Sequence, residues 1–253
     1  MNEKINTEKA PEPVGSYPHA RRVGNLLFLS GVGPRKPGTK VIPGVMVDGQ
    51  GNAVGHDIET QCYSVFENVK IILEASGSRW DNLVDVTVFL TNMQRDFDTY
   101  NLIYAEYFKD NQPCRTTVEI SALPTPIAIE LKCIATIESE ETMLTKSIFF
   151  TIFLWNYLTA QNVEYLQSET FKQTNMPFSE AVRVGNLFFL SGQIGEVYTD
   201  IPGETKLVGG GIKPETIQTM ENIKSVLERN GLSLDNVVKC TCMLADISDW
   251  AEM

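Results

Sequence analysis

Histidine is scarce in this chain, and so is any pattern that would bind a metal. The 253 residues include only two histidines, His19 and His56. No Cys/His cluster has the spacing of metal ligands, so the sequence predicts no metal and no other cofactor. The five cysteines are odd in number and lie within apolar runs. This favours reduced thiols in a cytosol over a disulfide framework.

Positive charge is also in short supply. Lysine and arginine number 21 against 32 acidic residues, which gives a formal net charge of −11. Such a chain lacks the basic surface that nucleic acid binding requires, so we expect no nucleic acid partner. Small anionic substrates are not excluded, because one local arginine can outweigh a distant field.

The N-terminus lacks an apolar core. Its first fifteen residues, MNEKINTEKAPEPVG, therefore predict no secretory signal at that end. What the chain has instead is the composition of a soluble globular protein, with 43% hydrophobic and 21% charged residues. Its length suffices for two domains of ordinary size.

The chain repeats itself. Three segments recur in the same order: RVGNLLFLSG (22–31) as RVGNLFFLSG (183–192), ENVKIILEASG (67–77) as ENIKSVLERNG (221–231), and DNLVDVTVFL (81–90) as DNVVKCTCML (235–244). We therefore predict a complete domain at 11–138, a linker at 139–175 and a second, truncated copy at 176–253. The second copy lacks counterparts of the last strands of the first, so we expect it to be poorly ordered or associated.

Hydrophobic periodicity predicts the elements of the first copy. Strands are expected at 23–30, 84–90, 114–120 and 127–137, and a Gly/Pro-rich loop or hairpin at 34–55. A helix should begin at Asp57 and end near Gly77, and a second should carry an aromatic face. These apolar faces are formed by Cys62, Val65, Phe66, Val69, Ile72 and Leu73, and by Phe97, Tyr100, Tyr104 and Phe108.

Two helices with one apolar face each predict an α+β sandwich in which the helices cover one side of the sheet. The strands VDVTVFL and AIELKCIATI are apolar on both faces. We therefore expect an oligomer that packs sheet against sheet. Cys240 and Cys242 are expected to be small core residues of a strand in the second copy.

One charged residue in a β pattern is a candidate for chemistry. Arg115 lies in PCRTTVEI, and Glu130 lies in the next strand pattern. If these strands pair, the two side chains can share a surface, and a structural ion pair or simple exposure to water is the ordinary interpretation. The functional alternative is that Arg115 binds a carboxylate through two parallel hydrogen bonds while Glu130 deprotonates a water. Backbone N–H groups at Ser30–Gly31 could then bind a substrate oxygen.

Several motifs together resemble a known family. RVGNLLFLSGVG, ENVKIILEASG, DVTVFLTNM and PCRTTVEISALPTPIAIELKCIA look like the YjgF/RidA family of imine and enamine deaminases. The resemblance spans about residues 11–138. The stretches YPHARRVGN, SGVGPR and IPGV are closest to 2-aminomuconate deaminases within it.

The resemblance implies a chorismate-mutase-like fold, assembled as a homotrimer with sites between subunits. It implies that Arg115 grips a substrate carboxylate and that Glu130 positions the hydrolytic water. Five further residues are expected to bind substrate: Tyr17, Ser30, Gly31, Phe89 and Thr117. Thr117 stands where many members have cysteine, so a thiol role is lost. His19 stands where many have glutamine, and a lining or surface role is expected for it.

The function implied is a cofactor-free hydrolytic deaminase for a small carboxylate-bearing enamine or imine, such as 2-aminomuconate. The alternative is a RidA-like regulatory or ligand-binding protein without catalysis. We expect the first domain to be cytoplasmic.

The joint between the copies resembles neither of them. MLTKSIFFTIFLWNYLTAQ (143–161) looks like a secretory signal peptide, which would export the second copy if two adjacent genes have been joined. The alternative is an apolar linker helix. The run is too short for a stable membrane span.

Overall fold

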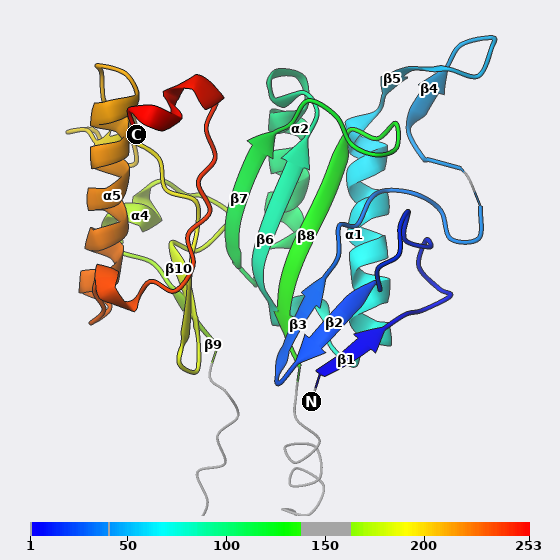
Figure 1. The fold of residues 1–253 in the computed structure, drawn as a ribbon, viewed down its shortest axis with the longest axis horizontal. Helices are drawn as coiled ribbons and strands as arrows, with labels where there is room; N and C mark the ends of the chain where they lie inside the picture. The colour runs from blue at the N-terminus through cyan, green and yellow to red at the C-terminus, as the bar shows by residue number, and fades with distance from the viewer. Residues whose placement is uncertain (1, 40, 138–162) are drawn as a thin grey trace, which may run out of the picture.

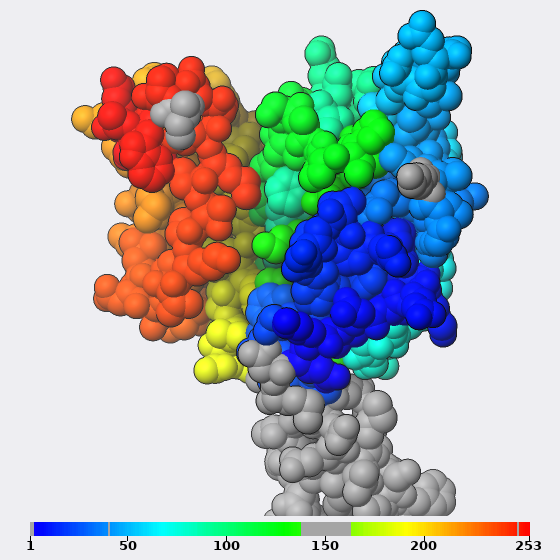
Figure 2. All heavy atoms as spheres, turned by 45° about the vertical axis from the view of Figure 1, so that its right-hand side comes forward, coloured from blue at the N-terminus to red at the C-terminus, as the bar shows by residue number. Residues whose placement is uncertain are grey.

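The computed structural model describes residues 2–39, 41–137 and 163–253. Residues 2–137 form an N-terminal part, and residues 163–253 form a C-terminal part that lies against it (Figures 1 and 2). The signal-like segment at 143–161 lies outside the described residues. Within the described ranges, no helix is both long and apolar enough to cross a membrane.

A six-stranded sheet forms the centre of the N-terminal part. Its order is β1-β2-β3-β8-β6-β7, and only β6 and β7 pair in parallel. Parallel neighbours need a crossover, which here includes a helix. The strands are β1 (Asn2–Ile5), β2 (Ala20–Val23), β3 (Leu26–Leu29), β6 (Leu83–Leu90), β7 (Cys114–Glu119) and β8 (Ile129–Thr136).

Two helices cover one face of this sheet (Figure 1). They are α1 (Ile58–Ala75) and α2 (Met93–Tyr107). The expected helix start and stop are confirmed: Asp57 is the N-cap of α1, and Gly77 has a positive φ of 73° just after its end. The predicted apolar faces lie in one buried cluster with β6 and β8, although Phe97 is only partly buried.

Alternation along β6 and β8 separates the two sheet faces. Val86, Val88 and Leu90 are buried against the helices, whereas Asp85, Thr87 and Phe89 are only partly buried. Because successive side chains on a strand point to opposite faces, the second set lies on the face that α1 and α2 leave uncovered. The α+β sandwich expected from the two helical patterns is confirmed.

Three sequence expectations for the N-terminal part needed correction or completion. The strand expected at 23–30 is confirmed for residues 26–29, which form β3, whereas Val23 belongs to β2 and pairs with Leu26 in a tight hairpin. Gly24, with φ 62°, supplies the left-handed residue that such a two-residue turn needs. Residues 2–5, for which no structure was expected, pair with β2 as β1. The loop at 34–55 contains a hairpin, β4 (Val45–Val47) and β5 (Ala53–His56).

The C-terminal part repeats the first hairpin. Strands β10 (Ala181–Val184) and β11 (Leu187–Leu190) pair like β2 and β3, and Gly185 repeats the positive φ of Gly24. A further strand, β9 (Val163–Leu166), pairs with β10 and lies inside the range expected to be linker. The remaining elements are α4 (Glu169–Gln173), β12 (Glu196–Tyr198), β13 (Thr205–Leu207), α5 (Ile212–Arg229) and the short 3-10 helices η1 (Trp80–Asn82), η2 (Leu234–Asn236) and η3 (Ile247–Ala251), of which η1 belongs to the N-terminal part.

The strand expected around Cys240 and Cys242 in the second copy is wrong. Residues 237–246 form no strand, and Cys240 and Cys242 are exposed rather than buried in a core. In the N-terminal part, β7 and β8 provide both neighbours of the corresponding strand β6. Residues 163–253 provide no such neighbouring strands, so residues 237–246 have no strand with which to form backbone hydrogen bonds.

The C-terminal part covers one end of the open sheet face. Val182 and Val184 of β10 are buried in a cluster with Leu26, Val84 and Cys114 of the N-terminal sheet. The apolar open face therefore packs against another sheet within the same chain. Further along this face, Phe89 and Thr87 stay partly exposed.

Candidate functional site

Arg115 lies on β7, one of the two edge strands of the sheet, and is almost fully buried at 6% exposure. It pairs in register with Val86, so its side chain lies on the helix-covered face. One guanidinium nitrogen donates a hydrogen bond to Asn101 Oδ1 of α2 at 2.7 Å. The guanidinium carbon lies 4.8 Å from the ring centre of Tyr104 and 5.8 Å from that of Tyr100. Helix α2 therefore holds this cation through an amide and two π-faces.

No carboxylate neutralises Arg115 among the residues that the structure describes. A buried cation without a counter-ion is costly, because burial removes water that nothing ionic replaces. Such a guanidinium has the chemistry to bind an anion, because its planar fork matches a carboxylate.

Three buried hydroxyls near Arg115 also lack well-aligned hydrogen-bond partners among the described residues. They belong to Thr117, Tyr100 and Tyr104. Burial is the largest cause that raises the pKa of both tyrosines, so their hydroxyls stay protonated and can donate. Thr117 follows Arg115 by two residues and therefore shares its face of β7. The surroundings of Arg115 thus place three buried hydroxyls beside a cation that has no carboxylate partner among the described residues, an arrangement that suits a ligand with several oxygens.

Glu130 lies on the other face of the sheet. It pairs in register with Phe89 of β6, which lies on the open face. Burial raises the pKa of the Glu130 carboxyl, and the charge of Arg35 opposes this rise. A side chain on Gly31 would overlap the Glu130 carboxylate, so the missing Cβ of Gly31 lets the backbone of Ser30–Gly31 approach that group.

The expectation that Arg115 and Glu130 share a surface is wrong for a single chain. Strands β7 and β8 do not pair with each other, because β6 lies between them. Arg115 faces the helices, whereas Glu130 faces away from them. One copy of the chain therefore contributes the two residues to two different places.

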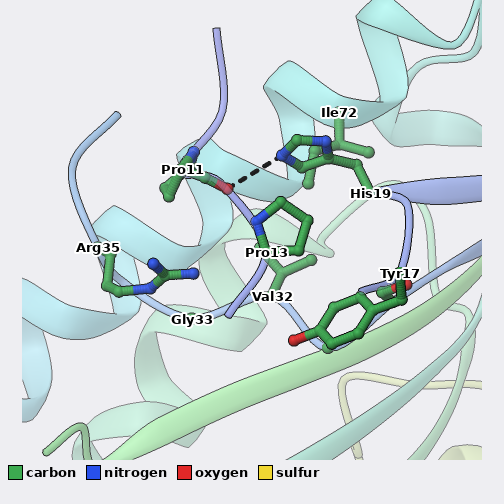
Figure 3. Close-up of a pocket in the computed structure, with 10 residues that line it drawn as sticks. Pro11, Pro13, Tyr17, His19, Val32, Gly33, Arg35 and Ile72 are labelled. Carbon is green, nitrogen blue, oxygen red and sulfur yellow. Dashed lines mark hydrogen bonds between the residues drawn. The ribbon is translucent and has the colours of Figure 1, made fainter. Parts of the chain in front are cut away.

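A hollow beside Ser30 and Gly31 collects most of the other expected residues (Figure 3). Tyr17 and Arg35 extend toward its middle from opposite sides (Figure 3). The Ser30 hydroxyl donates to the carbonyl oxygen of Pro18 at 2.7 Å, which leaves its lone pairs free. The lining residues are Pro11, Pro13, Tyr17, His19, Ser30, Gly31, Val32, Gly33, Arg35 and Ile72.

His19 lines this hollow as a structural residue. Its Nε2 lies 3.0 Å from the Pro11 carbonyl oxygen, to which it donates, and its Nδ1 accepts from the Thr7 N–H at 3.4 Å. Both ring nitrogens therefore form hydrogen bonds with the segment between β1 and β2. The buried Asn68 of α1 holds the other wall, donating to the carbonyl oxygens of Gly33 and Arg35 at 2.8 Å.

The C-terminal part covers the edge of β7 at Arg115. The Phe178 ring centre lies 4.4 Å from the Arg115 guanidinium carbon. The Arg115 backbone N–H donates to Ser191 Oγ at 2.9 Å, and the Gly192 N–H donates to the Arg115 carbonyl oxygen at 3.2 Å. Residues 178–192, named here the cap segment, thus extend the edge of β7.

The cap segment has the internal geometry of residues 17–31. Ser191 Oγ donates to the Ser179 carbonyl oxygen at 2.6 Å, as Ser30 Oγ does to Pro18. The Ser191 N–H donates to the Glu180 carbonyl oxygen, as the Ser30 N–H does to His19. In this correspondence, the residues of the cap segment that touch Arg115 match Tyr17, Ser30 and Gly31 of the N-terminal part.

Comparison with known proteins agrees with these motifs. The sequence model of the endoribonuclease L-PSP family matches residues 7–137 and 168–253. A RutC family protein of Pyrococcus horikoshii is 42% identical over 135 residues, which cover 53% of this chain and 98% of the relative. The chain belongs to the YjgF/RidA family. Reactive Intermediate Deaminase A of Arabidopsis thaliana is 39% identical, over 53% of this chain and 66% of that protein.

Among solved structures, the YjgF gene product of E. coli is 32% identical, over 54% of this chain and 99% of that one, with a TM-score of 0.46. Asn101, Tyr100, Tyr104 and Phe178 are contacts of Arg115 in this YjgF/RidA protein that the sequence interpretation missed. Asn101 had a detectable signal, because a polar residue lies between the aromatic positions of α2. Phe178 had only the internal repeat, in which it corresponds to Tyr17, because its contact with Arg115 arises from the folded arrangement of the two parts. No group of three or more potential metal ligands occurs within the described ranges.

Proposed function

We propose that the chain is a cofactor-free hydrolytic deaminase for small carboxylate-bearing enamines or imines, with 2-aminomuconate as the substrate to test first. The observation that carries this proposal is the buried Arg115 guanidinium, which has no carboxylate partner among the described residues. The printed name of the Arabidopsis relative, a reactive intermediate deaminase, supports the same class of reaction.

The complete site forms between two copies of the chain. The contacts between the cap segment and Arg115 support this arrangement, because the cap segment shares the internal geometry of residues 17–31. Residues 17–31 of a second chain, seated in the same way, would bring Ser30, Gly31 and the adjacent Glu130 to Arg115 of the first. This arrangement supports the homotrimer proposed for the N-terminal part, in which each subunit gives Arg115 to one neighbour and Glu130 to the other.

In the proposed reaction, the enamine first tautomerises to its imine. Arg115 holds the substrate carboxylate through two N–H groups, and Asn101 fixes the orientation of the guanidinium. Glu130 accepts a proton from water, and the water oxygen forms a bond to the imine carbon. The C–N bond then breaks and ammonia leaves with the protons of the attacking water, so that a carbonyl remains.

Tyr17, Phe89, Thr117 and the Ser30–Gly31 backbone would line the substrate. The elevated pKa of Glu130 fits its role, because a more basic carboxylate removes a proton from water more readily. Neither the imine nor the water is oxidised or reduced overall. Every atom of the products comes from the substrate and water.

The test is ammonia release from 2-aminomuconate, compared with release from simple imino acids. Arg115→Met should lower kcat/KM by about a hundredfold, since two hydrogen bonds to a charged group are worth about 3 kcal/mol. Arg79→Met is the matched control, because Arg79 is an exposed surface cation far from β7 in sequence. Equal ammonia release by Arg115→Met and the unaltered protein would refute the proposal.

The alternative is a regulatory or ligand-binding protein without catalysis. The separation of Arg115 and Glu130 within one chain favours it, because a lone chain could bind a carboxylate yet would not activate water. Ligand binding without ammonia release, at protein concentrations where the chain self-associates, would support this alternative. The family description also names an endoribonuclease, but a net charge of −11 opposes binding of RNA phosphates.

A further inference from the structure

The cap segment takes the place on β7 that the proposed function assigns to a second chain. The outward-facing backbone N–H and carbonyl of Arg115 are both used, by Ser191 and Gly192. Phe178 covers the guanidinium. An edge strand can pair with only one partner along that edge. Residues 17–31 of a second chain and the cap segment of the same chain therefore exclude each other.

The two occupants differ in what they bring to Arg115. Residues 17–31 carry Glu130 with them, because Gly31 packs directly on its carboxylate. The cap segment contains one carboxylate, Glu180, which is already bound. It accepts from the Arg229 guanidinium at 2.5 Å and from the Ser168 N–H at 3.0 Å. The cap segment thus closes the anion site without supplying a free base.

We propose that the cap segment is an intramolecular inhibitor, which competes with a second copy of this chain for the β7 edge and so controls self-association and deamination together. This inference rests on the proposed function for its catalytic part. Its association part stands on the contacts alone. Docking of the C-terminal part leaves the chain unassembled at β7, and undocking exposes Arg115 to a partner.

Covalent connection explains why the cap segment has the advantage in dilute solution. Two modules of one chain can meet at an effective concentration of about 1 mM. A second chain at micromolar concentration competes with this poorly. The joint adds a buried apolar contact between Val182, Val184 and Cys114, together with a 2.6 Å hydrogen bond from Gln167 to Gln112. Self-association should therefore require either high concentration or loosening of this joint.

A reversible disulfide tests the proposal in the full chain. A Cβ on Gly192 would lie 3.6 Å from the Thr116 Cβ, which is within the usual disulfide range of about 3.5–4.5 Å. Thr116→Cys with Gly192→Cys should lock the cap segment onto β7. The exposed Cys240 and Cys242 are changed to serine in the same protein, and peptide mapping verifies the bond against the nearby Cys114.

The oxidised protein should stay monomeric in sedimentation at every concentration and release little ammonia. Reduction should restore concentration-dependent association and raise ammonia release about fivefold or more, the lower range of coupling between sites. Val182→Asp is the second variant, because a carboxylate in the joint should undock the cap segment permanently. It should associate at lower concentration than the unaltered chain. Ile217→Asp, on the exposed side of α5, is its control.

The outcomes separate the two proposals. Identical association of the oxidised, reduced and Val182→Asp proteins would overturn the inhibitor role. Association that follows the cap segment as expected, but without ammonia release in any state, would leave the inhibitor of assembly standing and refute the deaminase. Release that changes with oxidation state supports both.

Discussion

Arg115 and Glu130 point to opposite faces of one sheet, with β6 between their strands. The surroundings of each group affect its charge. The Arg115 guanidinium is buried without a carboxylate partner among the described residues, and burial raises the pKa of the Glu130 carboxyl. Neither can reach the other within the chain. A reaction that uses both groups at one site therefore requires at least two chains.

Mixing two inactive variants should restore activity. Arg115→Met removes the anion anchor, and Glu130→Gln removes the base. If the site forms between chains, a one-to-one mixture assembled after dissociation contains interfaces with both native residues, in about one quarter of cases by random pairing. Ammonia release should therefore recover to about that fraction of the unaltered protein. Each variant assayed alone should release little ammonia. A mixture that assembles normally but releases no more ammonia than the single variants would contradict the shared site.

Gly31→Ala should disable the Glu130 side of the site. Its methyl group would overlap the Glu130 carboxylate, so the carboxylate or the Ser30–Gly31 backbone must move. We expect at least a tenfold loss of ammonia release and a decrease of about 1–3 kcal/mol in the free energy of unfolding, as for other overpacked positions. Gly49→Ala is the matched control, because an added Cβ there meets nothing within 4 Å. Equal behaviour of the two variants in melts and activity would show that Gly31 is not tightly packed.

The sequence alone was sufficient for the elements with strong periodicity. The apolar face of α1 and the alternation along β8 follow from residue spacing, because each buries one side against the same core. Residue spacing could not predict whether Arg115 and Glu130 lie on the same face, because this depends on the order of the strands in the sheet. The hairpin at Gly24–Asn25 had a local turn signal that an apolar run concealed. Phe178 reaches Arg115 from a distant part of the sequence, and no local pattern encodes that contact.

The activity should depend on the ionisation of Glu130. As a base, the carboxyl works only when deprotonated, and burial raises its pKa above the ordinary value for glutamate. The acidic limb of the kcat/KM profile should therefore lie at higher pH than a free glutamate would give. Arg35→Gln removes the charge that opposes this rise, so it should move the limb further up. Arg79→Gln should leave it in place. A limb that is unmoved by Arg35→Gln would show that another group controls the rate.

Stability should fall with rising pH because of Asp85, which lies on the open sheet face beside the joint with the C-terminal part. Burial, opposed by the charges of Lys132 and Lys239, raises the pKa of Asp85 from 3.8 to about 7. Between these values the folded chain holds a proton that the unfolded chain has lost. The contribution of Asp85 to stability is therefore complete below about pH 4 and is lost as pH rises through about 7. The slope should reach at most about 1.4 kcal/mol per pH unit. Asp85→Asn should flatten denaturant melts measured across this window, whereas Asp81→Asn, at an exposed carboxylate, should not. An unchanged slope in Asp85→Asn would assign the pH dependence to other groups.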